Sequence, residues 1–306
     1  MLRRRRTVLA ALALVAAAVG GCGEDYVPSA LPSRSPAQPT VAATPSEPTG
    51  GPASDGPAAP STAAPPSTAA PAAAPPLWVV GARPLPLRPD GFGQVLPTPD
   101  VLVNRALPTA DVLPPPPTDA FTSSVAPVPA AVAARSTWQP SCPVTLAELR
   151  YVTVAFWGFD GRHHTGELLL NARAADAVVG VFAQLHAARY PIEEMRVTAA
   201  PELDAPPTGD GNNTGAFVCR PARGQARWSA HAHGLALDLN PFVNPYVRGD
   251  LVLPELASAY VNRGNVRPGM LRAGDPTVRA FAAIGWSWGG SWSSPRDTMH
   301  FTATGG

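Results

Sequence analysis

Residues 229–238 read Ser-Ala-His-Ala-His-Gly-Leu-Ala-Leu-Asp, which places His231 seven residues before Asp238. On one straight strand, an odd separation would point these two side chains to opposite faces. Gly234 resolves the conflict, because glycine permits a turn between a loop that carries His231 and a strand over residues 235–239 that presents Asp238. The stretch therefore predicts that an imidazole and a carboxylate face one site.

A second pair of site residues lies near the C-terminus, in the sequence Asp297-Thr-Met-His300. Imidazole nitrogens and carboxylate oxygens suit zinc, and a catalytic zinc needs three protein ligands with one position left for water. We therefore predict one zinc ion on His231, Asp238 and His300. Asp297 is expected beside the bound water, where a carboxylate can accept its proton as the water attacks a carbonyl. The four residues predict peptide hydrolysis without a covalent intermediate.

Together these residues form the pattern S-x-H-x-x-G-x-A-x-D, followed far along the chain by D-x-x-H. The pattern resembles the M15 family of zinc D-alanyl-D-alanine carboxypeptidases, which includes VanY-like members and phage L-alanyl-D-glutamate endopeptidases. The resemblance implies zinc on His231, Asp238 and His300. It also implies a general base at Asp297, where several relatives carry the longer glutamate. It runs over roughly residues 138–302 and includes Phe159–Gly161, Gly166–Leu168, Asn212–Thr214, Cys219–Arg220, Trp228–Ser229, Asn240–Pro241, Asn244–Tyr246 and Gly285–Trp286.

Five further residues are candidates for the cleft. Arg220 matches an arginine that family members place there, where a guanidinium can stabilise an oxyanion or hold a carboxylate; a surface arginine is the alternative. Ser229 and Asn213 either bond to substrate or cap turns. His233 takes a position where relatives often carry an aromatic residue, so it is expected to line the cleft rather than bind zinc. Trp286 lies among tryptophans that either wall the cleft or pack in the core.

The C-terminal part of the chain predicts an α+β fold with a mainly antiparallel sheet and flanking helices. The resemblance implies that this is the zinc fold of DD-peptidases and Hedgehog-type domains. Strands are expected over residues 151–156 and 166–171, joined by a turn at Asp160-Gly161. Asn171 is expected to cap a helix that ends before Pro191. The other expected elements are strands over 195–198, 235–239 and 299–302 and a helix over 275–284.

The first residues predict export. The basic residues 3–6 precede an uncharged stretch over residues 7–21, which is too short to cross a bilayer and is typical of a secretion signal. The signal is expected to end at residue 21. Cys22 follows small residues as in a bacterial lipoprotein, and acyl chains on it would anchor the protein to the outer face of the cytoplasmic membrane. An ordinary signal peptide with a chance cysteine is the alternative.

Composition divides the exported chain into three parts. Residues 22–76 consist mostly of Pro, Ala, Ser, Thr and Gly and predict a disordered tether that reaches the cell wall. Apolar residues without a period appear among prolines over 77–137, which indicates an extended arm partly packed on the domain, with more linker as the alternative. Residues 138–306 form the expected zinc peptidase domain. A disulfide between Cys142 and Cys219 is expected because exported proteins meet an oxidising environment; two free thiols are the alternative.

The charge balance excludes nucleic acid as a partner. The net charge is +1 and 15% of residues are charged, whereas phosphate binding needs clustered Lys and Arg. We expect a monomer that hydrolyses an amide bond of peptidoglycan stem peptides, as a D-Ala-D-Ala carboxypeptidase does. The alternatives are an L-Ala-D-Glu endopeptidase and a wall-binding module that keeps the zinc fold without catalysis. Asp297 argues against the module, because a purely structural zinc site closes with four ligands.

Overall fold

The computed structural model describes residues 78–222 and 225–305. These residues form the predicted α+β fold, with a few helices and four small sheets whose strands are mostly antiparallel. Among the described residues, none of the helices has the length and apolar character that crossing a membrane requires.

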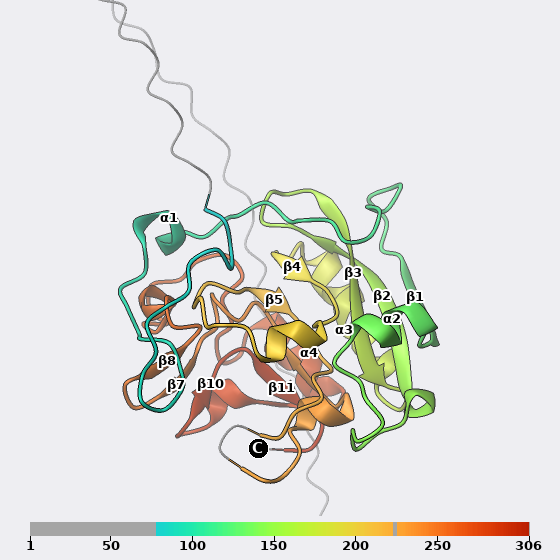
Figure 1. The fold of residues 1–306 in the computed structure, drawn as a ribbon. Coiled ribbons are helices and arrows are strands. Elements are labelled where there is room, and N and C mark those ends of the chain that lie inside the picture. The colour runs from blue at the N-terminus through green and yellow to red at the C-terminus, as the bar shows by residue number, and fades with distance from the viewer. Residues whose placement is uncertain (1–77, 223–224, 306) are drawn as a thin grey trace, which may run out of the picture. The chain divides into compact units, whose positions relative to one another are not determined.

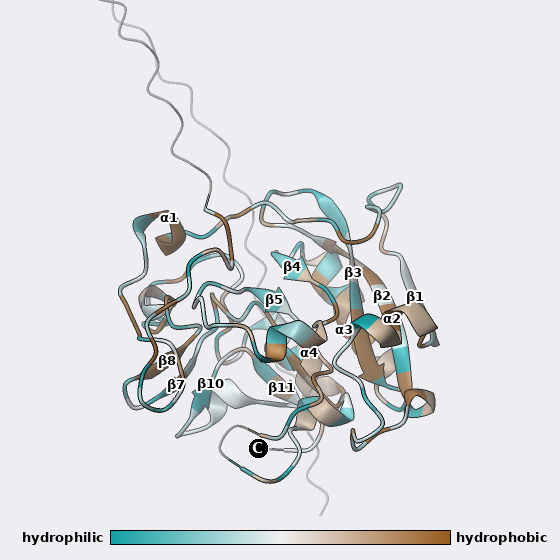
Figure 2. Cartoon of the chain, in the orientation of Figure 1, coloured by the Kyte–Doolittle hydropathy of each residue, from teal (hydrophilic) through white to brown (hydrophobic). Residues whose placement is uncertain are grey.

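The two longest strands form a hairpin. β2 (Leu149–Trp157) and β3 (His163–Asn171) pair in antiparallel register from end to end. The turn between them contains Gly161, whose φ of 73° lies in the left-handed region that favours glycine. Most side chains of both strands are buried, which explains why their apolar runs predicted the hairpin from the sequence. Figure 2 shows hydrophobic residues along β2, which lies between its two partners.

The third strand of this sheet comes from the segment that was expected as an arm. β1 (Ser123–Pro127) pairs with β2 and completes the order β1-β2-β3 (Figure 1). Its side chains are mostly exposed, so the sequence has no apolar alternation there by which a strand could be predicted. The same segment forms two short helices, α1 (Asp100–Val103) and α2 (Ala130–Arg135). The described residues of this segment, 78–137, therefore form regular elements and also pack on the rest of the fold.

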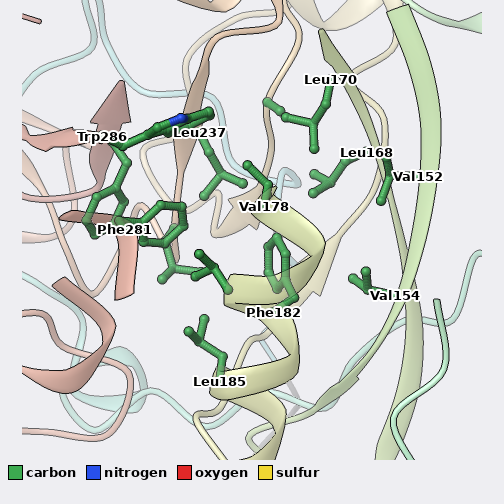
Figure 3. Close-up of a cluster of buried hydrophobic side chains, with 14 of the residues drawn as sticks. Val152, Val154, Leu168, Leu170, Val178, Phe182, Leu185, Leu237, Phe281 and Trp286 are labelled. Atoms are coloured by element: carbon green, nitrogen blue, oxygen red, sulfur yellow. The ribbon is translucent and has the colours of Figure 1, made fainter. Parts of the chain in front are cut away.

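Helix α3 (Ala175–Ala187) packs on the hairpin, and the largest core cluster forms around it. Figure 3 shows its side chains between the strands on one side and Phe281 and Trp286 on the other. The predicted cap at Asn171 is wrong. Asn171 ends β3, its side-chain amide donates to the backbone carbonyl of His233 at 3.1 Å, and α3 begins at Ala175 without a side-chain cap.

Three further sheets are built from short strands. β11 lies between β6 and β9, β7 lies between β10 and β8, and β4 pairs with β5 in parallel. The strand expected over 195–198 is only the two-residue β4. The bounds are β4 Glu194–Met195, β5 Asn213–Thr214, β6 Ala236–Asp238, β7 Tyr246–Arg248, β8 Leu251–Leu253, β9 Ser287–Trp288, β10 Arg296–Asp297 and β11 His300–Thr302.

The remaining helices are short. α4 (Pro276–Ala283) begins with proline and is followed by Gly285 at a φ of 80°, the two signals that predicted it. It packs against α3. The 3₁₀ helices are η1 Leu146–Glu148, η2 Ala200–Leu203, η3 Ala230–His233, η4 Ser258–Tyr260 and η5 Gly289–Ser291.

A second core cluster joins the N-terminal described residues to the C-terminal half. Leu102 of α1 is fully buried in it together with Tyr260. Arg105 follows, and its guanidinium donates to both carboxylate oxygens of Glu193 at 2.6 Å. Both side chains are buried, and Asn212 donates a further hydrogen bond to Glu193. A buried ion pair therefore fixes the N-terminal segment on the rest of the fold.

Replacing Glu193 by glutamine is expected to lower the free energy of unfolding by about 3–5 kcal/mol, because removing one partner leaves the buried charge of Arg105 uncompensated. Chemical denaturation of both proteins measures the difference. Glu202→Gln is the matched control, since its pair with Arg196 is more exposed and such pairs contribute about 0–1 kcal/mol. Equal losses in the two variants would contradict a special role for the buried pair.

The first described residues are also held by a buried carboxylate. The indole nitrogen of Trp78 donates to Asp210 at 2.8 Å, and the backbone amide of Gly81 donates to both oxygens of the same carboxylate. Thr208 donates a further hydrogen bond to Asp210. This Trp78–Asp210 clamp fixes the chain at the start of the described part.

Cys142 and Cys219 form the predicted disulfide. It joins the loop before β2 to the segment that carries Arg220, across a sequence separation of 77 residues. Cys219 is buried in a third core cluster together with Leu149 of β2. The disulfide therefore ties the segment next to Arg220 to the central hairpin.

Candidate metal centre and cleft

His231 lies on η3, which directly precedes β6. The Ser229 hydroxyl caps this short helix by accepting a hydrogen bond from the His231 amide. Gly234 ends the helix with a φ of 63°, and a Cβ there would lie 2.6 Å from the backbone nitrogen of Asn171. The backbone conformation and the contact with β3 both require glycine at this turn.

Asp238 and His300 face each other across two paired strands. β6 and β11 are antiparallel, and Asp238 lies directly opposite His300 in their register, so the two side chains share one face. His300 Nδ1 lies 2.9 Å from Asp238 Oδ1. The backbone of Asp238 exchanges two further hydrogen bonds with Gly215, which fix the end of β6.

The three predicted ligands come together at one point. His231 Nε2 lies 3.2 Å from His300 Nδ1 and 3.3 Å from Asp238 Oδ2, and one donor atom from each residue lies within 4.8 Å of the others. His231 Nδ1 lies 2.6 Å from the carbonyl oxygen of Ala216. That nitrogen therefore carries the proton and donates it, which leaves the Nε2 lone pair directed at the other two residues. Two imidazoles and one carboxylate form a donor set that could hold zinc.

The surroundings shift the pKa values of the two carboxyl groups of the site, Asp238 and Asp297, in opposite directions. Burial alone would raise the pKa of Asp238, but its contacts with His231 and His300 outweigh burial and lower that pKa. The pKa of Asp297 is raised to about 7, first by burial and then by the charge of Asp238, with His300 and Arg220 opposing the rise. Asp297 Oδ1 is buried and has no hydrogen-bond partner among the described residues. It is therefore an unused acceptor next to the three ligand candidates.

A cleft of about 690 Å³ opens beside His300. Ser229 and His233 line it, and the ring centroid of Trp292 lies 5.6 Å from that of His300. Arg227 also lines the cleft, and the sequence did not single it out because it carries no spacing signal; Trp228 lines the cleft too and belongs to the pattern that gave the resemblance. The lining residues are Ala222, Gln225, Arg227, Trp228, Ser229, Ala230, His233, Trp292, Ser293, Ser294, Pro295, His300, Thr304 and Gly305.

Two predicted substrate contacts are placed elsewhere. Trp286 is buried in the main core, where its ring centroid lies 5.9 Å from that of Phe281 (Figure 3). Both polar atoms of the Asn213 side chain are hydrogen-bonded to the backbone of Arg196, which ties β5 to the segment after β4. The structure gives Trp286 a packing role and Asn213 a backbone-fixing role.

Arg220 lies beside the disulfide and acts on the site through its charge. Its guanidinium donates to the carbonyl of Pro221 at 3.2 Å, and its positive charge lowers the pKa of Asp297. The backbone carbonyl of Arg220 accepts a hydrogen bond from the Ser229 amide. The segment around Arg220 therefore lies along the start of the loop that carries His231.

The family model described as D-alanyl-D-alanine carboxypeptidase matches residues 223–303. The match includes the three ligand candidates and Asp297, and it leaves out Arg220 and Asn213. It confirms the resemblance for this C-terminal part, which is shorter than the range 138–302 expected from the sequence. Neither the comparison with curated proteins nor the comparison with solved structures found a match.

Proposed function

Because residues 223–303 match the family model described as D-alanyl-D-alanine carboxypeptidase, we propose that the protein is a zinc peptidase that hydrolyses an amide bond of peptidoglycan stem peptides. The observation that supports it best is the convergence of His231, Asp238 and His300 beside the unpaired oxygen of Asp297. A purely structural zinc site would close with a fourth ligand and would need no such acceptor.

The proposed chemistry assigns a separate task to each residue of the chain. When zinc is bound, it polarises a carbonyl and lowers the pKa of a bound water to about 7. Asp297 accepts the proton of the attacking water and later delivers it to the leaving amine. Arg220 stabilises the negative charge that develops on the carbonyl oxygen. His233 and Ser229 line the path of the peptide.

Defined muropeptides test this proposal when they are incubated with the zinc-loaded full chain and analysed by mass spectrometry. Loss of a terminal alanine supports the carboxypeptidase, whereas cleavage between L-Ala and D-Glu assigns the endopeptidase. A protein that binds zinc and muropeptides but releases no product would be a wall-binding module, and the proposed activity would then be wrong. The same incubation after removal of the metal by a chelator is the control.

Gly289 is predicted to keep Asp297 in place. A Cβ at this position would lie 2.6 Å from the carbonyl oxygen of Asp297, 3.0 Å from its Cβ and 3.1 Å from the Trp292 ring. Gly289→Ala is therefore expected to lower turnover by about 10²-fold, since a displacement of about 1 Å can cost that much, while zinc stays bound. Gly180→Ala is the control, because no atom within 4 Å meets a Cβ on that helix. Unchanged kcat in Gly289→Ala would show that Asp297 needs no such support.

We also propose that the protein is held outside the cytoplasmic membrane by a lipid on Cys22. This residue, the signal over 1–21 and the tether over 22–76 lie outside the described residues. The disulfide is in keeping with export, because disulfides persist in oxidising compartments. Radiolabelled palmitate is expected to enter the wild-type precursor in bacterial cells and to be absent from Cys22→Ala. Equal labelling of the two proteins, or none in either, would remove the anchor.

A further inference from the structure

A second cavity lies next to the cleft. It measures about 220 Å³ and shares Ser293 and Ser294 with the cleft described above. Two of its other lining residues are Arg263 and Arg296, and none of the described residues that line it is acidic. We name it the Arg263–Arg296 pocket.

Arg263 brings a buried positive charge to this pocket. Its guanidinium donates to four oxygen atoms, and all four belong to neutral groups: the carbonyls of Val243, Tyr260 and Leu271 and the amide of Asn244. The pKa of Arg263 is lowered to about 10, mainly by burial; the charges of Arg272 and Arg296 contribute to the fall, and Tyr190 and Asp275 oppose it. The guanidinium is therefore fixed in direction, but no acid among these partners compensates its charge.

Arg296, on strand β10, brings a second positive charge to the pocket. It precedes Asp297 in β10, and consecutive side chains of a strand point to opposite faces. The half-buried Asp297 interacts electrostatically with Asp238 and His300, so Arg296 faces away from them and lines the pocket. Its side chain is exposed and makes no hydrogen bond or ion pair within the described part of the chain.

Two serine residues also line the pocket. The side chains of Ser293 and Ser294 make no hydrogen bonds to other described residues, and both line the cleft as well as the pocket. Guanidinium and hydroxyl donors without an acid are the groups that bind carboxylates and phosphates. These two serines therefore border both the cleft and the pocket.

We propose that the Arg263–Arg296 pocket binds an oxyanion, and that the peptide held in the neighbouring cleft supplies it as a carboxylate. The second part rests on the proposed peptidase function, whereas the first part does not. Free inorganic phosphate is the other source of the same chemistry. The side chain of Arg296 is the group to vary, because Arg263 also holds four backbone and side-chain oxygens of the core.

The first arm of the test needs no turnover. Inorganic phosphate is titrated with the zinc-loaded full chain, and the width of its phosphorus NMR signal is measured. Broadening is expected with the wild type, and it is expected to shrink in Arg296→Gln and to persist in Arg296→Lys. Arg173→Gln is the matched control, an exposed arginine at the start of α3 without a side-chain partner in the described part of the chain. Phosphate on the metal would broaden the signal equally in all variants.

The second arm compares two peptides with the same scissile bond, one with a side-chain carboxylate and one with the matching amide. KM for the carboxylate peptide is expected to be about tenfold lower, as for one charge-assisted hydrogen-bonded contact. Arg296→Gln is expected to abolish this ratio. An indirect effect on the neighbouring Asp297 would instead lower kcat for both peptides alike.

The outcomes separate the parts of the proposal. If Arg296→Gln changes neither the phosphate signal nor the KM ratio, the pocket binds no oxyanion. If phosphate broadening depends on Arg296 but the two peptides have equal KM values, the pocket binds an oxyanion and the substrate does not supply it. A KM ratio that depends on Arg296 supports the substrate carboxylate, whatever the affinity for phosphate. If neither peptide is cleaved, the proposed function fails while the phosphate arm still decides the pocket.

Discussion

Asp297→Asn is expected to lower turnover by about 10² to 10⁴-fold while zinc stays bound, because the change removes a general base and keeps its shape. The geometry supports this expectation, since one oxygen of the half-buried Asp297 is buried without a partner among the described residues, and the charges of Asp238 and His300 act on this carboxyl group. The measurements are kcat on a stem peptide at saturating zinc and metal content by elemental analysis.

The two readouts give this variant three distinct results. Retained zinc with reduced kcat supports Asp297 as the base. Loss of zinc would make Asp297 a fourth ligand, and the base would then be sought elsewhere, first at His233. Retained zinc with full kcat would refute the proposed mechanism. Asp275→Asn is a suitable control, because Asp275 lies at the start of α4 and outside the cleft lining.

His231→Ala is expected to lose most of the bound zinc and, with it, all measurable turnover. The variant leaves only two donor atoms, whereas a catalytic zinc needs three protein ligands. His233→Ala is a closely matched control, since the two histidines lie on the same 3₁₀ helix but only His231 reaches Asp238 and His300. Elemental analysis after dialysis measures the metal, and circular dichroism of both variants shows whether they are folded.

Full zinc occupancy in a folded His231→Ala protein would remove His231 from the ligand set. Zinc loss in His233→Ala would move the ligand to that histidine. The structure argues against the second result, because the proton on His231 Nδ1 is held by the Ala216 carbonyl and its Nε2 is directed at the other ligands.

His231 and Asp238 could be predicted as a pair because a local sequence signal sets their geometry, whereas His300 was found through the D-x-x-H pattern and reaches the site by the pairing of β11 with β6. Gly234 marks the turn that a histidine and an aspartate seven residues apart require, and the structure has that turn with a positive φ. The long hairpin and α4 were equally accessible, since apolar runs, a terminal proline and a following glycine act within a few residues. These features depend little on distant parts of the chain.

The features that were missed depend on tertiary contacts. β1 exposes most of its side chains, so only its pairing with β2 identifies it as a strand. Asn171 is a residue type that often caps helices, but its side-chain amide instead donates a hydrogen bond to the backbone carbonyl of His233. Trp286 and Trp292 have similar sequence surroundings, and only the packing of Trp286 on Phe281 shows which one lies in the core.

The Trp78–Asp210 clamp has a mechanical consequence for a protein proposed to be tethered at Cys22. A pull along the chain from its N-terminal side would reach the described fold at Trp78 and meet the three hydrogen bonds that Asp210 accepts from Trp78 and Gly81. Behind them, the Arg105–Glu193 pair forms a second point of resistance. The load would be borne by the N-terminal segment and the second core cluster, so β6 and β11, which carry Asp238 and His300, would keep their register under tension.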